Sequence, residues 1–312
     1  MRYKVLVTGG AGYIGSMLVP SLLDRGYSVT VVDNLSFGQT TLLESCINHE
    51  FSFVKGDISD QSLMESLLPK HDVIIPLAAI VGAPACAKNP ALTKLINKDA
   101  PLHMLKQLSL EQKILFPTTN SGYGVGESGK LCDENSPLRP LSEYARTKVE
   151  IEDAVLQSGN AITFRLATVF GMSPRMRMDL LVNDFVYRSL VDKYVVLFEE
   201  NFRRNYIHVR DVVSAFMFGI SHFEEMKGQP YNTGLSDANL TKLQLCEKIK
   251  QHITELNIFV SAVGTDPDKR DYLVNNERIE SFGWRPEYSL DDGIKELIKG
   301  YQLLRPNVYT NN

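Results

Sequence analysis

The pair Tyr144 and Lys148, four residues apart, is the feature of this 312-residue chain that most directly predicts chemistry. On a helix, a spacing of four places two side chains on the same face, one turn apart. A free tyrosine, with a pKa of about 10, is a poor base at neutral pH. A neighbouring ammonium lowers that pKa, so the phenol can exchange a proton with a substrate hydroxyl. We therefore expect Tyr144 to be a catalytic base and Lys148 to lower its pKa.

A run of hydroxyl residues precedes this pair in the chain, Thr118-Thr119-Asn120-Ser121. It directly follows an apolar stretch that has the pattern of a buried strand. We expect the Thr119 hydroxyl to bind the reacting oxygen of the substrate together with Tyr144, and Thr118 to lie nearer a cofactor. A threonine that only caps a turn is the alternative interpretation.

Three glycines spaced G-x-x-G-x-x-G lie near the N-terminus, in the segment Thr8–Ser16. Glycine at these places permits a tight turn, close approach of a pyrophosphate and close packing of a helix on a strand. The N–H groups at the start of that helix attract phosphate. The pattern predicts a dinucleotide site with contacts from Gly9, Gly12, Tyr13, Ile14 and Gly15.

Acidic residues after the next two expected strands indicate which dinucleotide binds. Asp33 is placed to accept a hydrogen bond from a ribose 2′-hydroxyl, and its charge would repel a 2′-phosphate. Because Asn34, Leu35 and Ser36 follow it and no arginine does, we expect NAD and not NADP. The further cofactor contacts predicted here are Asn34, Ser36, Asp57 and Ile58, and Lys148 would also hold the nicotinamide ribose.

The elements that must position these residues follow from hydrophobic periodicity. The expected strands are Lys4–Val7, Val29–Val32, Phe51–Val54, Val73–Ile75, Ile114–Phe116 and Ile162–Phe164. The expected helices are Ile14–Arg25, Gln61–Leu68, Ala91–Leu108, Ser142–Gln157, Asp179–Leu190, Val209–Ile220 and Leu290–Leu304. Their alternation predicts an α/β protein with a Rossmann-type, doubly wound parallel sheet and a smaller C-terminal substrate-binding lobe. We expect residues 1–170 to bind NAD, with 205–225 packing back onto them, and residues 171–312 to form most of the substrate lobe.

Composition excludes several classes of function. The net charge of −4 gives no reason to expect binding to nucleic acid or to an anionic membrane. The longest apolar tract is short and is interrupted by proline and glycine, so we expect no membrane span and a cytoplasmic protein. We also expect no metal, because no group of histidine, cysteine and acidic residues has the spacing of a metal site.

Taken together, these motifs resemble the extended short-chain dehydrogenase/reductases, and among them the NAD-dependent nucleotide-sugar epimerases and dehydratases. The likeness covers nearly the whole chain and rests on TGGAGYIGS, DNLS, GDI, PLAA, YARTK and RRNYIHVRDV. It implies cofactor contacts from Leu77, Ala78 and Ala79 of the PLAA segment. It further implies hydride transfer from C4 of a nucleotide-activated sugar to NAD, and a homodimer, with Ala91–Leu108 and Ser142–Gln157 as the dimer helices.

The chain departs from the family at places that narrow the reaction. Family 4,6-dehydratases carry an Asp-Glu pair directly after the catalytic threonine, where this chain has Asn120-Ser121. Elimination needs an acid and a base there. We therefore expect oxidation at C4, with or without reduction again on the other face, but not dehydration.

The expected substrate is a nucleotide diphosphate sugar, whose phosphates suit guanidinium groups. Arg175, Arg177, Arg204 and Arg270 are the candidates for that contact, and the resemblance adds Asn183. Thr168 stands where UDP-galactose 4-epimerases often have asparagine, so it is a further candidate contact that weakens the case for a UDP-hexose.

A closer likeness narrows the expectation further. IPLAAIVGAP, RLATVFGMSPRMRMDLLVNDF and DPDKRDYLVNNERI look like a bacterial subgroup that includes the GDP-manno-heptose 4-dehydrogenases of capsule biosynthesis. That likeness implies a GDP-sugar and a 4-keto product, with a 2-keto acid such as α-ketoglutarate as the second acceptor. The alternatives are a nucleotide-sugar 4-epimerase of the UDP-hexose type and a non-catalytic, NAD-responsive binding protein on the same fold.

Overall fold

The structure is a computed structural model, and it describes residues 2–127, 129–262 and 269–304. By its internal contacts the chain forms two compact units. Unit 1 comprises residues 1–119, 142–165 and 213–231, and unit 2 comprises residues 120–141, 166–212 and 232–312. The assignment of NAD binding to residues 1–170 and of substrate binding to residues 171–312 stays a prediction.

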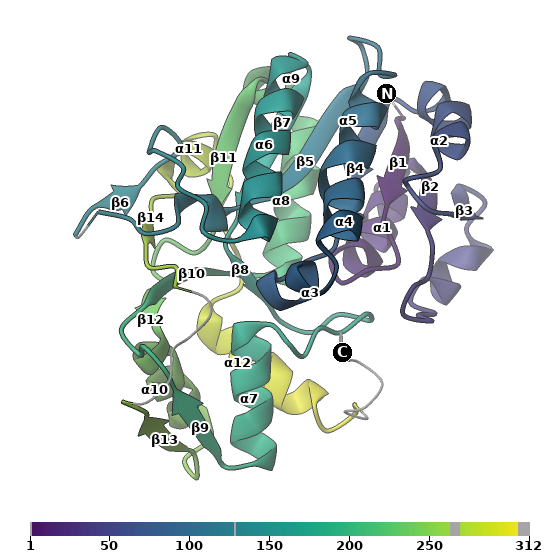
Figure 1. Ribbon diagram of the computed structural model, residues 1–312. Coiled ribbons are helices and arrows are strands. Elements are labelled where there is room, and N and C mark those ends of the chain that lie inside the picture. The colour runs from purple at the N-terminus through teal and green to yellow at the C-terminus, as the bar shows by residue number, and fades with distance from the viewer. Residues whose placement is uncertain (1, 128, 263–268, 305–312) are drawn as a thin grey trace. The chain divides into compact units, whose positions relative to one another are not determined.

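Unit 1 is built on a seven-stranded sheet with the order β11-β7-β5-β4-β1-β2-β3 (Figure 1). The strands are β1 (Lys4–Thr8), β2 (Ser28–Asp33), β3 (Phe51–Lys55), β4 (Val73–Pro76), β5 (Lys113–Thr119), β7 (Ala161–Leu166) and β11 (Gln229–Thr233). β1 lies between β2 and β4 and pairs in parallel with both. On the outer sides, β2 pairs in parallel with β3, and β4 pairs in parallel with β5. The predicted Rossmann-type fold and all six predicted strands are confirmed, and β11 adds a strand that was not predicted.

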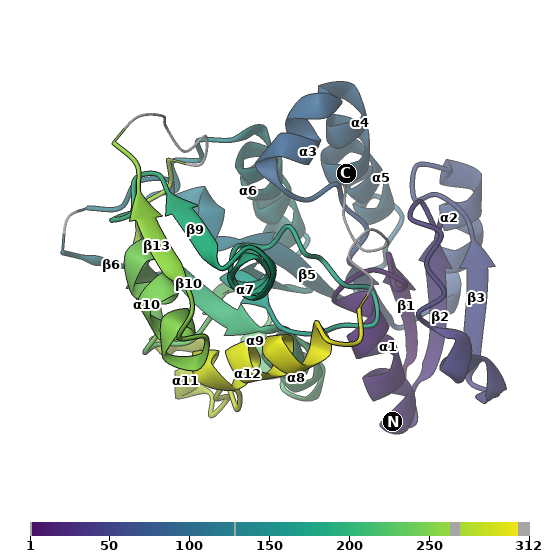
Figure 2. The same ribbon diagram turned by 90° about the horizontal axis from the view of Figure 1, so that it is seen from below.

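Helices cover both faces of this sheet, as Figure 2 shows. They are α1 (Gly15–Asp24), α2 (Gln61–Leu67), α3 (Ala83–Lys88), α4 (Pro90–Lys94), α5 (Ala100–Leu105), α6 (Glu143–Gln157), α8 (Val209–Ser221) and α9 (Phe223–Met226). Alternate residues of one strand face opposite sides. On β5, Ile114 and Phe116 pack with Ile151 of α6, whereas Leu115 lies against Gly219 of α8. This alternation places α6 and α8 on opposite faces of the sheet at β5.

The predicted helix Ala91–Leu108 is confirmed as a helical stretch, but it ends at Leu105 and contains a π-turn. The structure divides it into α4, a π-helical turn over Leu95–Asp99, and α5. Pro101 lies in the first turn of α5, and it has no N–H to continue the ladder of hydrogen bonds from the preceding segment. The wider turn contains the buried Asn97, and π-turns of this kind are frequent at functional sites.

Unit 2 contains small sheets and several helices. Its strands are β6 (Leu131–Cys132), β8 (Thr168–Phe170), β9 (Tyr194–Leu197), β10 (Arg203–His208), β12 (Asn239–Thr241), β13 (Asn257–Val260) and β14 (Leu273–Val274). Its helices are α7 (Leu181–Val191), α10 (Lys242–His252), α11 (Glu277–Ser281) and α12 (Leu290–Gly300), with a 3-10 turn over Asn120–Tyr123. Capping boxes at Thr241 and Ser289 begin α10 and α12. The predicted helix Leu290–Leu304 begins where expected and ends earlier, at Gly300.

Candidate active site

The glycine loop occupies the carboxyl end of β1, at the point where the strand order reverses between β1 and β4. In doubly wound sheets this is where ligands bind. Gly9 has φ +70°, and a Cβ there would lie 2.6 Å from the backbone nitrogen of Ala78. A Cβ on Gly15 would lie 2.5 Å from the Cα of Gly10. Only glycine fits either place, because the loop packs directly against the backbone at Ala78 and the helix start packs against Gly10.

The start of α1 has the electrostatics that a pyrophosphate needs. The helix begins at Gly15, its N-cap Ile14 provides no side-chain hydrogen bond, and its first turn carries no acidic residue. The positive end of the helix dipole is therefore not neutralised by the helix's own side chains. This helix end, with the glycine loop beside it, fits the phosphates of NAD.

Asp33 lies at the end of β2 and contacts the glycine loop directly. Its carboxylate accepts hydrogen bonds from the backbone N–H of Ala11 at 3.0 Å and of Leu35 at 2.8 Å. Asp33, the residue predicted to bind the ribose, thus also joins the end of β2 to the glycine loop. Its neighbour Asn34 donates from Nδ2 to Oδ2 of Asp57 at 2.8 Å, so two of the predicted cofactor contacts lie together.

Asp57 is held in its charged form. Although burial acts to raise the pKa of Asp57, hydrogen bonds from Ser59 and Asn34 outweigh it and lower the pKa below its ordinary value. Ile58 beside it is buried, whereas Asn34 and Ser36 are exposed at the surface. A charged Asp57 can accept hydrogen bonds from a cofactor hydroxyl or amine.

Asn97 is a site residue that the sequence did not reveal. Its side chain accepts from the backbone N–H of Ile80 and donates to the carbonyl of the same residue, both at 2.8 Å. It thereby fixes the end of the loop Leu77–Ile80, whose Ala78 backs Gly9. An amide within an otherwise apolar helix pattern was the signal available.

The three residues with predicted catalytic roles all lie in unit 1. Thr119 ends β5, and Tyr144 and Lys148 stand one turn apart on α6, which Ser142 caps by accepting from the N–H of Ala145 at 3.2 Å. Lys148 donates from Nζ to the carbonyl of Pro117 at 3.2 Å. The helix that carries Tyr144 is thus tied to the strand end that carries Thr119.

Lys148 is buried, and its ammonium lies 5.0 Å from the ring centre of Phe116. Loss of hydration lowers the pKa of Lys148 to about 8, while the nearby Cys86 acts weakly in the opposite direction. At neutral pH the side chain is still mainly an ammonium. A charge in such an apolar place acts strongly on a neighbouring phenol.

Thr118 has a partner that the sequence did not predict. Its hydroxyl donates to Oε2 of Glu152 at 2.6 Å, within the buried interior of unit 1. The hydroxyl hydrogen is used in this bond, so we do not assign Thr118 a hydrogen bond donated to the cofactor.

In unit 2, the loop after β8 carries Arg175, Arg177 and, at the start of α7, Asn183. Asn183 is fully buried, accepts from the N–H of Gly171 at 3.0 Å and donates to the carbonyl of Arg177 at 2.8 Å. Asn183 therefore shapes the arginine loop from inside. Arg177 pairs with Asp179 at 2.6 Å, and Arg175 is buried and donates to the carbonyl of Met176.

The other two candidate arginines lie together. Arg204, buried on β10, donates to the carbonyl of Arg270, and Arg270 donates to the hydroxyl of Ser121. Arg203 holds the neighbouring Asp271 by two bonds of 2.9 and 3.0 Å. Thr168 starts β8 and pairs in register with Tyr206 of β10. The structure thus brings Arg204, Arg270 and Ser121 into one polar group.

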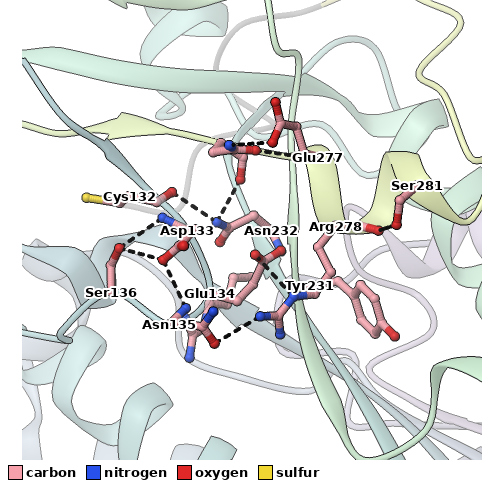
Figure 3. A network of polar contacts seen from close by, with 12 residues as sticks. Cys132, Asp133, Glu134, Asn135, Ser136, Tyr231, Asn232, Glu277, Arg278 and Ser281 are labelled. Carbon is pink, nitrogen blue, oxygen red and sulfur yellow. Dashed lines mark hydrogen bonds and ion pairs between the residues drawn. The ribbon is translucent and has the colours of Figure 1, made fainter.

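A buried polar network in unit 2 supports the segment that follows the 3-10 turn (Figure 3). Glu134 accepts from the N–H of Asn232 at 2.8 Å and pairs with Arg278 at 3.4 Å. Asn232 in turn donates to the carbonyl of Cys132 at 3.2 Å. It also accepts from the hydroxyl of Tyr123 at 2.7 Å. These bonds hold Tyr123, Cys132 and Glu134 around Asn232.

Comparison with known proteins agrees with this geometry. The family model "NAD dependent epimerase/dehydratase family" matches residues 5–234. The chain belongs to the NAD dependent epimerase/dehydratase family. It is therefore an NAD-dependent enzyme of the short-chain dehydrogenase/reductase type, and NAD is its cofactor.

Individual relatives are distant but match over nearly their full length. The chain is 28% identical to a dTDP-glucose 4,6-dehydratase of an Actinoplanes species, over 97% of this chain and 98% of the relative. A Thermotoga maritima UDP-glucose 4-epimerase, solved with UDP-glucose, is 26% identical with a TM-score of 0.84, over 96% of this chain and 99% of that one. The Thermus thermophilus UDP-glucose 4-epimerase, solved with NAD, is 25% identical with a TM-score of 0.82, over 97% and 99%.

Two further kinds of feature are absent from the described ranges. No helix there is long and apolar enough to cross a membrane. Nor do the residues in those ranges bring together three or more histidine, cysteine or acidic side chains that could hold a metal ion.

Proposed function

We propose that this enzyme oxidises C4 of a nucleotide-activated sugar. The observation that carries the proposal is the buried Lys148, one turn from Tyr144 on α6 and bonded to the strand end that carries Thr119. When bound, NAD supplies the hydride acceptor. Tyr144 takes the proton of the C4 hydroxyl, Thr119 orients that hydroxyl, and the Lys148 ammonium stabilises the phenolate form of Tyr144.

The residues of the cofactor site each have a task in this proposal. The glycine loop and the start of α1 bind the pyrophosphate, and Asp33 accepts from the adenosine ribose. Lys148 also holds the nicotinamide ribose. Loop Leu77–Ile80, fixed by Asn97, lines the cofactor next to Gly9.

The substrate's diphosphate would bind the arginines of unit 2, with Asn183 shaping the loop that presents Arg175 and Arg177. Guanidinium forks match phosphate oxygens. The names of the relatives support a nucleotide sugar, since UDP-glucose and dTDP-glucose appear among them. We propose a GDP-manno-heptose in particular, giving a 4-keto sugar for capsule or surface polysaccharide, on the likeness of three sequence segments. A 2-keto acid would then be the second acceptor.

A 4-epimerase is the second candidate. Two structures that the chain resembles over nearly their full length are UDP-glucose 4-epimerases. In that reaction the 4-keto sugar is reduced again on its other face, with no net redox change. Dehydration is disfavoured because Asn120 and Ser121 occupy the positions of the acidic pair of 4,6-dehydratases.

The test begins with mass spectrometry of ligands retained on purification, followed by GDP-, UDP-, CDP- and dTDP-sugars as substrates. A 4-keto product with a rise in absorbance at 340 nm, without a second acceptor, supports the dehydrogenase. A C4-inverted product without that rise supports the epimerase. Preference for UDP or dTDP would overturn the GDP-heptose proposal, and no turnover on any nucleotide sugar would overturn C4 oxidation.

Three further expectations remain proposals. A homodimer would use the segments Ala91–Leu108 and Ser142–Gln157, and the first of these leaves the apolar side chain of Leu92 exposed. Sedimentation at micromolar concentration tests the oligomeric state. The cytoplasmic location and the assignment of binding roles to the two parts of the chain also stay predictions.

A further inference from the structure

A buried charged cluster lies on the catalytic face of α6 and has no part in the chemistry described above. Glu152 of α6 is 1% exposed, and Arg165 at the end of β7 is 5% exposed. Arg165 donates from Nε and Nη2 to Oε1 of Glu152, at 2.9 and 2.6 Å. Both residues belong to unit 1, as do Thr118 and Thr163, which complete the cluster.

The two oxygens of Glu152 have separate partners. Oε1 is held by Arg165, while Oε2 accepts from the hydroxyl of Thr118 at 2.6 Å and from that of Thr163 at 3.4 Å. The first of these distances is typical of a strong bond from a hydroxyl to a carboxylate, whereas the second is long. Thr118 is therefore the main hydrogen-bond donor to Oε2 of Glu152.

The cluster also has a definite relation to the catalytic residues. Glu152 follows Lys148 by four residues and Tyr144 by eight, so all three lie along one face of α6. Lys148 binds the carbonyl of Pro117, and Glu152 binds the hydroxyl of Thr118. Two successive turns of the helix thus hold the two residues that directly precede Thr119.

Stability alone is a weak reason for such a pair. Buried ion pairs can often be replaced by apolar residues without loss of stability. Precise placement is a stronger reason, because a displacement of about 1 Å at a reacting group can cost about 10²-fold in rate. A carboxylate locked by a guanidinium is a rigid acceptor for the Thr118 hydroxyl.

We propose that Glu152 and Thr118, with Arg165 as the clamp, are positioning residues that set Thr119 relative to Tyr144. This inference rests on the proposed function, because it takes Thr119 and Tyr144 as the pair that contacts the substrate hydroxyl. Neither Glu152 nor Thr118 touches the substrate in this role. They act through the backbone of β5 and the face of α6.

The test compares two threonines that bind the same oxygen. Thr118→Val removes the short bond next to Thr119, and the matched control Thr163→Val removes the long bond from the middle of β7. We expect Thr118→Val to lose about tenfold in kcat per bound NAD with KM unchanged, Thr163→Val to stay within twofold, and Thr118→Ser to restore most of the rate. Equal rates in both valine variants, or no rescue by serine, would overturn the proposal.

A second measurement needs no substrate. Hydrogen–deuterium exchange of the peptide that contains Thr119 should be faster in Thr118→Val than in the wild type, and unchanged in Thr163→Val. Unchanged exchange in Thr118→Val would overturn the positioning role even if no nucleotide sugar turned over. The proposed function, by contrast, fails only if the wild type itself turns over none of the nucleotide sugars.

Discussion

The phenol of Tyr144 is the group on which the proposed chemistry depends. Thr119 and Lys148 support it, but neither replaces its proton transfer. We expect Tyr144→Phe to lose at least about 10²-fold in kcat, which is the lower range for a general acid or base, while it retains NAD. Turnover with the substrate found in the nucleotide-sugar panel measures the loss, and absorbance of the released cofactor measures NAD content. Near wild-type turnover would contradict the assignment.

The buried ammonium of Lys148 predicts a conflict between stability and activity. Burial lowers the pKa of Lys148 from its ordinary 10.5 to about 8, which corresponds to about 3 kcal/mol at about 1.4 kcal/mol per pH unit. Because the folded pKa is the lower one, this cost is fully present below pH 8 and fades as the pH rises toward 10.5. We expect Lys148→Met to be inactive yet more stable than the wild type, by up to about 3 kcal/mol at pH 7.

Urea unfolding at pH 7 and at pH 10 checks this prediction. The stability gain of Lys148→Met should shrink at pH 10, where the wild-type lysine is mainly neutral. Tyr144→Phe is the matched control, because it removes a catalytic group and leaves the ammonium in place. A Lys148→Met variant no more stable than Tyr144→Phe at pH 7 would contradict the inferred cost of burial.

At the scale of elements, two glycines with similar backbone angles test whether the glycine loop needs its close packing. Gly9 and Gly26 both have positive φ, +70° and +78°, but a Cβ on Gly9 would meet Ala78 whereas one on Gly26 would meet nothing within 4 Å. Alanine at either position is therefore strained by the positive φ, but only alanine at position 9 also collides with Ala78. We expect Gly9→Ala to lower NAD affinity by at least about tenfold and Gly26→Ala to leave it unchanged.

Titration of NAD into cofactor-stripped protein tests this pair, and urea unfolding shows how much stability each variant has lost. Equal NAD affinity in the two variants would mean that the loop does not need its close approach to Ala78. The experiment is independent of the sugar, because only the cofactor is added.

The strands and the parallel order could be predicted because their signals are local. Each predicted strand is a short, β-branched run between turn residues, and a buried parallel sheet requires that pattern. The π-turn at Leu95–Asp99 could not be predicted in this way. The apolar residues continue at helical spacing across it, and Pro101 also fits the first turn of a new helix. The contact of Asn97 with Ile80 joins segments that are distant in the sequence.

The site was predictable to a similar, limited degree. The glycine loop, Asp33 and the Tyr144–Lys148 pair carry signals of spacing, and they lie together in unit 1. The Glu152–Arg165 pair carries no such signal, because a glutamate in a surface-patterned helix and an arginine in a strand are each ordinary. Only the fold shows that the two are buried against each other. Asn183 was predicted as a ligand, yet its amide bonds to the backbone of the arginine loop.

At the scale of the whole molecule, the residues predicted to bind NAD and those predicted to bind the diphosphate of the nucleotide sugar lie in different units. The net charge is −4, so overall attraction cannot draw in an anionic nucleotide, and local arginines must do so. The residues with predicted NAD contacts lie in unit 1, whereas all four candidate arginines lie in unit 2. Variants of the arginines should therefore change nucleotide binding without changing NAD content.

Arg177 and Arg188 allow that separation to be tested with a matched pair. Each is bonded to a nearby aspartate, Arg177 to Asp179 and Arg188 to Asp184, but only Arg177 lies in the loop that Asn183 shapes. We expect Arg177→Gln to weaken binding of GDP and UDP about tenfold by calorimetry, because a charged bond to phosphate contributes about 1.5 kcal/mol or more. Arg188→Gln should bind as the wild type does, and both should retain NAD. If Arg177→Gln lost NAD as well, substitutions in unit 2 would not affect nucleotide-sugar binding alone. The assignment of Arg177 to the diphosphate would then fail.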